Sequence, residues 1–75
     1  MKELIEFIAK AIVNAPDAVE VTEEPTEQGV LFKLLVADDD KGRVIGKQGR
    51  IAEAMRSLLR VKAAKEGTRA SLEIV

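Results

Sequence analysis

The chain has 75 residues, a formal net charge of −1, and neither cysteine nor histidine. The missing cysteines exclude disulfides and thiolate metal sites, and the missing histidines remove the commonest general base and zinc ligand. We therefore expect no catalytic residues, no metal and no cofactor. The length predicts a single domain over residues 1–75. No segment has the pattern of a signal peptide or a membrane-spanning helix, so a cytoplasmic location is expected.

Residues 2–14 carry apolar side chains at helical spacing, and they predict a helix that ends before Pro16. Residues 18–24 alternate between apolar and polar side chains, and residues 30–36 form a second, more apolar run. These two segments predict strands joined as a hairpin, with residues 25–29 as a five-residue loop.

The two phenylalanines, Phe7 and Phe32, are the only aromatic residues of the chain. Both lie in apolar segments, so we expect both in the core, where phenylalanine is most often found. A domain that stacks bases on aromatic side chains of its sheet is disfavoured by this composition.

Three consecutive aspartates, residues 38–40, precede the next segment. A calcium loop needs acidic residues at alternate positions, a glycine and a terminal glutamate, and this pattern is not met. We therefore expect an aspartate that caps the helix after it, since its carboxylate can accept hydrogen bonds from the first-turn amides.

The second half predicts a short helix or turn over residues 41–45, a loop over 46–49, a longer helix over 50–66 and a third strand over 69–75. The element order is then α-β-β-α-α-β. Apolar residues cover roughly 200° of the longer helix, more than an ordinary surface helix needs. The surplus face either lines a ligand groove, contacts a second copy, or simply packs in the core, and the pattern leaves these alternatives open.

Charge is distributed unevenly between the two halves of the chain. Residues 1–40 contain three basic and ten acidic residues, a net charge of −7, whereas residues 41–75 contain nine basic and three acidic residues, a net charge of +6. This asymmetry is a hint of an anionic partner for the second half. An uneven surface charge without any partner explains the same counts, so charge alone leaves both interpretations open.

The segment Gly46-Lys47-Gln48-Gly49 places two glycines three residues apart, directly before the longer helix. Glycines allow a tight turn, and the helix directs its free amides and positive dipole end toward the loop. With Arg43 and Arg50 nearby, the segment is a candidate site for phosphate groups, although a plain corner between helices has the same spacing. A nucleotide-binding P-loop is excluded, because Lys41 and Gln48 stand where that motif needs glycine and a hydroxyl residue.

The run Val44-Ile45-Gly46-Lys47-Gln48-Gly49-Arg50, placed between two helices, resembles the signature of KH domains. The element order resembles the type II arrangement, and over nearly its whole length the chain is similar to the small bacterial single-KH proteins of the KhpA family, also called YlqC. This resemblance implies an α+β fold with a three-stranded mixed sheet covered on one face by helices. It also implies a cytoplasmic RNA-binding protein that acts as an RNA chaperone or post-transcriptional regulator.

In KH domains the GXXG loop binds the backbone of about four nucleotides, and the adjacent helices and a strand edge form the groove for the bases. The resemblance thus implies phosphate contacts by the loop and its two flanking arginines, and an apolar groove wall formed by Val44, Ile45, Ile51 and Ala52. The expected RNA-binding residues are Arg43, Val44, Ile45, Gly46, Lys47, Gln48, Gly49, Arg50, Ile51 and Ala52, with Lys41 and Arg56 as further candidates for phosphate contact.

The expected partners are single-stranded RNA and either a second copy or a larger KH-containing RNA-binding protein, with no membrane involved. The alternative function is a protein-interaction module that dimerises and binds nucleic acid weakly or not at all. In that case the wide apolar face of the longer helix would be the main working surface.

Overall fold

The computed structural model describes the backbone of residues 1–75 and every side chain except that of Lys47. Six main elements follow one another: α1 (Lys2–Ile12), β1 (Glu20–Thr26), β2 (Gly29–Leu35), α2 (Lys41–Ile45), α3 (Arg50–Lys65) and β3 (Ala70–Ile74). The predicted α-β-β-α-α-β order is confirmed, and each predicted boundary lies within two residues of the observed one. Among the described residues, no helix combines the length and apolar character needed to traverse a bilayer.

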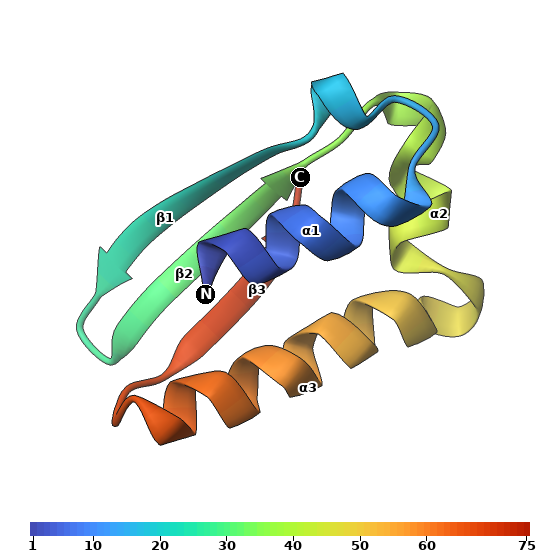
Figure 1. The fold of residues 1–75 in the computed structure, drawn as a ribbon. Coiled ribbons are helices and arrows are strands. Elements are labelled where there is room, and N and C mark those ends of the chain that lie inside the picture. Colours follow the sequence, from blue (N-terminus) through green and yellow to red (C-terminus); the bar gives the residue numbers. More distant parts are fainter.

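The three strands form one mixed sheet in the order β1-β2-β3 (Figure 1). β1 pairs with β2 antiparallel, and β2 pairs with β3 parallel. Parallel neighbours cannot be joined by a tight turn, so the chain must cross over between them. α2, the glycine loop and α3 form this crossover, which places the loop beyond one end of the sheet.

The hairpin between β1 and β2 is tighter than the sequence indicates. β1 continues through Pro25 and Thr26, so only Glu27 and Gln28 form the turn, and the prediction of a five-residue loop is wrong. Proline is tolerated here because β1 is an edge strand with only one neighbour. The Thr26 hydroxyl accepts a hydrogen bond from the Gly29 amide at 3.0 Å and closes the turn.

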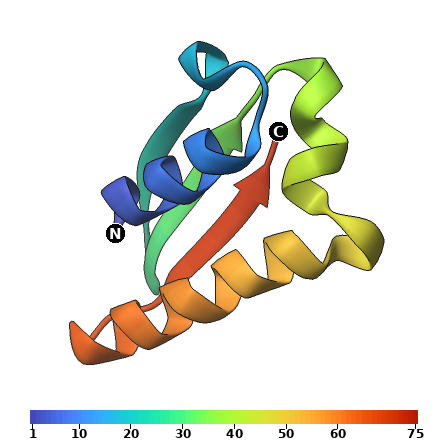
Figure 2. The same cartoon turned by 45° about the vertical axis from the view of Figure 1, so that its right-hand side comes forward.

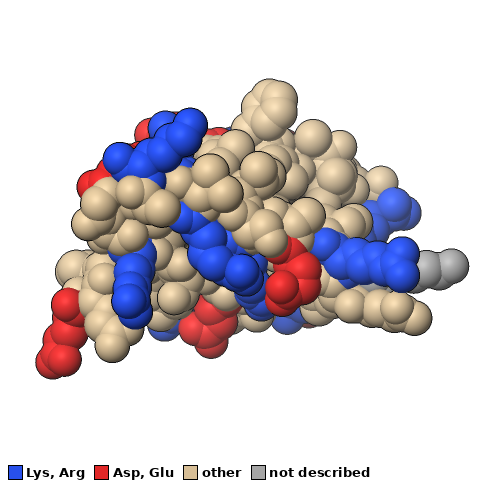
Figure 3. All heavy atoms as spheres, turned by 90° about the horizontal axis from the view of Figure 1, so that it is seen from below, with Lys and Arg blue, Asp and Glu red and all other residues tan. Residues whose placement is uncertain are grey.

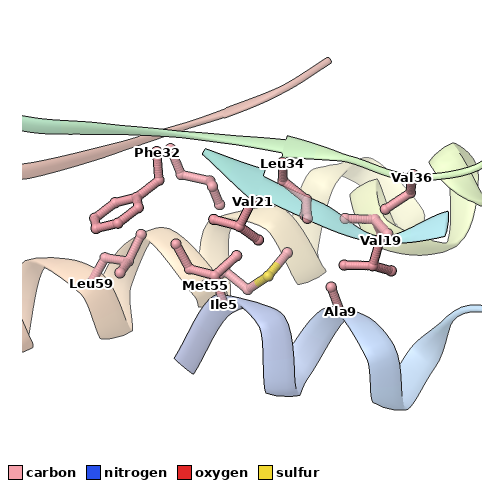
Figure 4. Packing of buried hydrophobic residues seen from close by; sticks show 11 residues of the cluster. Ile5, Ala9, Val19, Val21, Phe32, Leu34, Val36, Met55 and Leu59 are labelled. Carbon is pink, nitrogen blue, oxygen red and sulfur yellow. The ribbon is translucent and has the colours of Figure 1, made fainter. Parts of the chain in front are cut away.

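α1 and α3 cover the same face of the sheet (Figure 2), and the core lies between them and the strands. Alternate residues of each strand point toward the helices, among them Phe32 and Leu34 of the central strand, which are fully buried. In Figure 4 the Phe32 ring lies next to Leu59 of α3, and Ile5 of α1 and Met55 of α3 belong to the same cluster. The longer helix therefore uses one stripe of its wide apolar arc for the core.

The two phenylalanines have opposite environments. Phe32 is fully buried, as predicted, whereas Phe7 is 75% exposed, so the prediction of a core position for Phe7 is wrong. Ile5 and Ala9 define the buried face of α1. Phe7 stands two residues from each, about 200° around the helix from Ile5, and its ring therefore faces solvent.

Candidate nucleic-acid interface

The glycine loop between α2 and α3 is a sharp left-handed bend, not a helical continuation. Gly46 has a φ of 73° and a ψ of 178°, a combination that is essentially restricted to glycine. A β-carbon on Gly46 would also come within 2.8 Å of Ile51 Cγ1. The Gly49 amide donates to the Gly46 carbonyl at 3.3 Å and closes the bend.

Gln48, between these glycines, is the one described non-glycine residue with a positive φ, at 57°. This left-handed conformation costs a residue with a β-carbon about 1 kcal/mol or more. The Gln48 side chain is exposed and makes no described hydrogen bond that would offset the cost. Strain at an exposed position is typical of a segment whose shape serves binding.

The amino end of α3 begins directly at this bend. Gly49 is the cap residue, in the left-handed conformation, and no described side chain caps the helix. The amides of the first turn therefore lack intrahelical acceptors and carry the positive end of the helix dipole. Such an end binds anions when basic side chains stand nearby, and the exposed Arg50 is the first residue of the helix.

The four apolar residues predicted to line the groove separate into two pairs. Val44 and Ala52 are buried in the core, so their side chains support the loop from beneath, and their place in a groove wall stays a prediction. Ile45 is 41% exposed and Ile51 is partly exposed beside Gly46. Of these four described residues, the two isoleucines are the ones that present apolar surface next to the bend.

A buried carboxylate holds α2 in place. Asp40 is 1% exposed, and its two oxygens accept hydrogen bonds from the backbone amides of Asn14 and Ala15, each at 3.0 Å. No side-chain hydrogen bond from Asp40 reaches the first turn of α2, so the prediction of an aspartate cap is wrong. The sequence gives no signal for this role, because the partner amides are 25 and 26 residues away.

Asp40 also restrains one of the predicted phosphate-binding residues. The Arg43 Nε lies 3.6 Å from Asp40 Oδ1, while the arginine side chain is 55% exposed. Part of its charge is thus offset by the carboxylate, and the guanidinium is positioned at the start of the loop. The side chain of Lys47, predicted to contact phosphate, lies outside the described residues.

The two further candidates for phosphate contact differ in position. Lys41 pairs with the exposed Asp38 at 3.2 Å and belongs to the start of α2. Arg56 pairs with Glu53 at 3.1 Å, and its Nε donates to the Leu72 carbonyl on β3 at 3.4 Å. Arg56 therefore bridges α3 and the free edge of β3, and it lines a hollow of about 270 Å³ between them.

Four exposed acidic side chains lie at the other edge of the sheet. β1 and its turn carry Glu20, Glu23, Glu24 and Glu27, all exposed. β1 and β3 are two strand spacings apart, about 10 Å, which exceeds the Debye length of about 8 Å at physiological ionic strength. An anionic strand along α3 and β3 would thus be largely screened from this acidic edge.

The mixed sheet, the helices on one of its faces and the GXXG bend between α2 and α3 define the chain as a KH domain. The domain model described as "KhpA/KhpB, KH domain" matches residues 2–74. A solved structure of Aquifex aeolicus Era, the Y63A variant bound to GDP·AlF4⁻, superposes with a TM-score of 0.63 at 19% identity, over 97% of this chain and 28% of that one. At this identity the likeness shows the fold alone.

Curated relatives match along the full chain. The proteins named RNA-binding protein KhpA from Clostridium acetobutylicum and Caldanaerobacter subterraneus are 49% and 52% identical over 75 residues, the whole length of both chains in each case. The Treponema pallidum protein of the same name is 49% identical over 99% of this chain and 92% of its own. The chain belongs to the KhpA/KhpB family of KH domains. The prediction that it is not an enzyme is confirmed by this membership, since the family is one of KH-domain binding proteins.

Proposed function

We propose that the chain binds single-stranded RNA, with residues 46–49 against the phosphate backbone and the edge between α3 and β3 against the bases. The observation that carries this proposal is the left-handed bend at Gly46–Gly49, directly before the amino end of α3, which no described side chain caps. The names of the relatives support RNA as the ligand. Lys47, Arg43 and Arg50 would supply charge, and Ile45 and Ile51 the apolar contacts.

The direct test is the double substitution Lys47→Asp with Gln48→Asp, measured by fluorescence titration with a single-stranded RNA. Aspartate tolerates the left-handed conformation of residue 48, so the fold should persist. We expect the affinity to fall by about 2 kcal/mol or more, about thirtyfold, because two carboxylates would face the phosphates.

A control of equal charge separates loop contacts from general repulsion. Lys10→Glu with Thr22→Glu changes the net charge by the same three units at exposed positions of α1 and β1. This control should bind RNA nearly as well as the unchanged protein. Equal affinity of the loop variant and the control would contradict the proposed role of the loop.

Salt dependence tests phosphate capture independently of any substitution. With about three to four phosphates neutralised, the slope of log K against log salt should be about −2 to −3 for a single strand. A flat response would mean that the phosphates do not contribute. In cells, we propose that the protein acts in the cytoplasm as an RNA chaperone or post-transcriptional regulator, which crosslinking followed by sequencing of the bound RNA would test.

A second candidate function is self-association or pairing with a larger KH-containing protein. Its support is the apolar surface left on the helices: Phe7 is 75% exposed, Val61 59% and Leu58 47%. Burial of one such side chain contributes roughly 1.5–3 kcal/mol. Leu58→Glu with Val61→Glu should then reduce the mass measured by light scattering, whereas Ser57→Glu should not. An unchanged mass in the double variant would count against this function.

A further inference from the structure

A second and larger hollow, of about 640 Å³, lies at the end of α3 that is remote from the glycine loop. Three segments that are distant in the sequence form it: the β1–β2 turn, the last two turns of α3 and the start of β3. Its volume falls within the range of small-molecule sites in proteins. The expected KH groove does not include the β1–β2 turn, so this hollow is a separate feature.

Backbone contacts fix the walls of this hollow. The Val30 amide donates to the Arg69 carbonyl at 2.9 Å, which joins the hairpin to the start of β3. A β-carbon on Gly29 would stand 2.0 Å from that same carbonyl oxygen, so only glycine allows the approach. The Thr68 amide donates to the Ala63 carbonyl at 2.9 Å and ties the third segment to α3. The hollow is therefore formed before any ligand arrives.

The lining has the chemistry of a nucleotide site. Its charged residues are Arg60 and Arg69, and no acidic side chain lines it within the described part of a chain that contains 13 acidic residues. Arginine binds phosphate through paired donors in a planar fork. Hydroxyl groups, such as those of Thr26 and Thr68, can bond a ribose or base edge, and small side chains such as Ala63 leave room for a flat base.

The large hollow continues into the smaller one along α3 and β3. The two share Arg60, Ala70 and Ser71, and the smaller one adds Arg56 on the side of the glycine loop. Figure 3, which views the molecule from below, shows lysine and arginine side chains spread along its length, with acidic side chains among them. One ion pair of this region joins Arg60 to Glu53 at 3.9 Å. From the loop to the far end of the large hollow, α3 extends about 22 Å.

We propose that the large hollow is a second nucleotide subsite for the same RNA strand, with a phosphate between Arg60 and Arg69 and a base against the small side chains of α3. The inference rests on the proposed function, and it extends the bound segment beyond the roughly four nucleotides that a GXXG loop holds. The strand leaves the loop, follows the edge between α3 and β3 past Arg56, and ends against the β1–β2 turn.

The test compares RNA oligonucleotides of four and eight nucleotides of mixed sequence. The unchanged protein should bind the longer one more tightly. Arg60→Gln with Arg69→Gln should weaken binding of the eight-nucleotide RNA about tenfold, which is the effect of about one charge-assisted hydrogen bond. The same double variant should change the affinity for the four-nucleotide RNA less than about twofold. In NMR spectra, the amide signals of Gly29 and Thr68 should shift with the longer RNA alone.

The matched control is Lys62→Gln with Lys65→Gln, which removes the same charge from the same end of α3 at residues outside the hollow. Equal weakening by both pairs, or equal affinity of the unchanged protein for the two lengths, would overturn the subsite. Shifts at Gly29 and Thr68 produced by a poly-glutamate peptide and not by RNA would overturn it in favour of an acidic protein partner. If neither RNA binds at all, the proposed function itself fails, which is a distinct result.

Discussion

A glycine with the same φ lies at each end of α3, but the backbone hydrogen bonds around the two glycines differ. Gly49 at the start and Gly67 just after the end both have a φ of 73°, and both have open space around them. At the start, the bend leaves amide donors without described caps. At the end, the amides of Glu66, Gly67 and Thr68 return to carbonyls of the last turns and satisfy them.

A left-handed glycine is therefore not in itself a sign of a binding site. What matters is which backbone groups remain unpaired and which side chains surround them. Donors at the start of α3 attract anions, whereas the carbonyls of Lys62, Ala63 and Ala64 at its end are already bonded and carry the negative end of the dipole. If the far end binds phosphate, it must do so through Arg60 and Arg69, which line the hollow there.

The largest effect on stability is expected at the closed end. Gly29→Ala would place a β-carbon 2.0 Å from the Arg69 carbonyl oxygen, so the hairpin or the start of β3 must shift. We expect a loss of about 3 kcal/mol or more in the free energy of unfolding, measured by urea denaturation. Gln28→Ala, in the turn beside it, is the control. A stable Gly29→Ala variant would show that the two segments are less tightly joined than described.

At the open end, Asp40→Ala should cost about 2–3 kcal/mol, because the amides of Asn14 and Ala15 lose their acceptors. The neighbouring Asp39 is exposed, and Asp39→Ala should be nearly neutral. Arg43 would also lose its buried ion-pair partner, so the RNA affinity of the Asp40→Ala variant should change as well. Equal stability of the two variants would remove Asp40 as the anchor of α2.

Gly46→Ala should lower the free energy of unfolding by about 2 kcal/mol, since residue 46 occupies a glycine-only conformation and a β-carbon would meet Ile51. RNA affinity should fall further than the unfolded fraction explains, because the bend itself changes shape. Thermal unfolding and RNA titration on the same sample check both parts. If the Gly46→Ala variant has the stability of the unchanged protein and binds RNA with the same affinity, the bend tolerates another conformation.

The smallest effects distinguish the two ends directly. Gly49→Ala and Gly67→Ala face no clash, so each should cost only about 1 kcal/mol of left-handed strain. Only Gly49→Ala should weaken binding of a four-nucleotide RNA, because only that end presents free amides to it. Similar losses of RNA affinity in both variants would contradict the claim that only the start of α3 presents free amides to the RNA.

Local patterns predicted most of the fold correctly. Apolar spacing together with turn residues such as Pro16 and Gly67 located the elements to within two residues, with residues 41–45 predicted as a short helix or turn. The parallel pairing of β2 with β3 agrees with the mixed sheet implied by the KH resemblance. The errors arose where an outcome depends on distant residues. Pro25 stays in β1 only because that strand lies at the edge, Phe7 is exposed because Ile5 and Ala9 face the core, and Asp40 bonds amides far away in the chain.

The order of the elements and the position of the bend can be predicted from the sequence, because the spacing of apolar residues and glycines acts over a few residues. Which side chains of the loop region are accessible depends on tertiary packing: Val44 and Ala52 are buried, while Ile45 and Gln48 are exposed. The same packing places Thr26, Arg60 and Arg69 around one hollow. Burial and proximity of this kind depend on how helices pack on the sheet, and no local pattern encodes them.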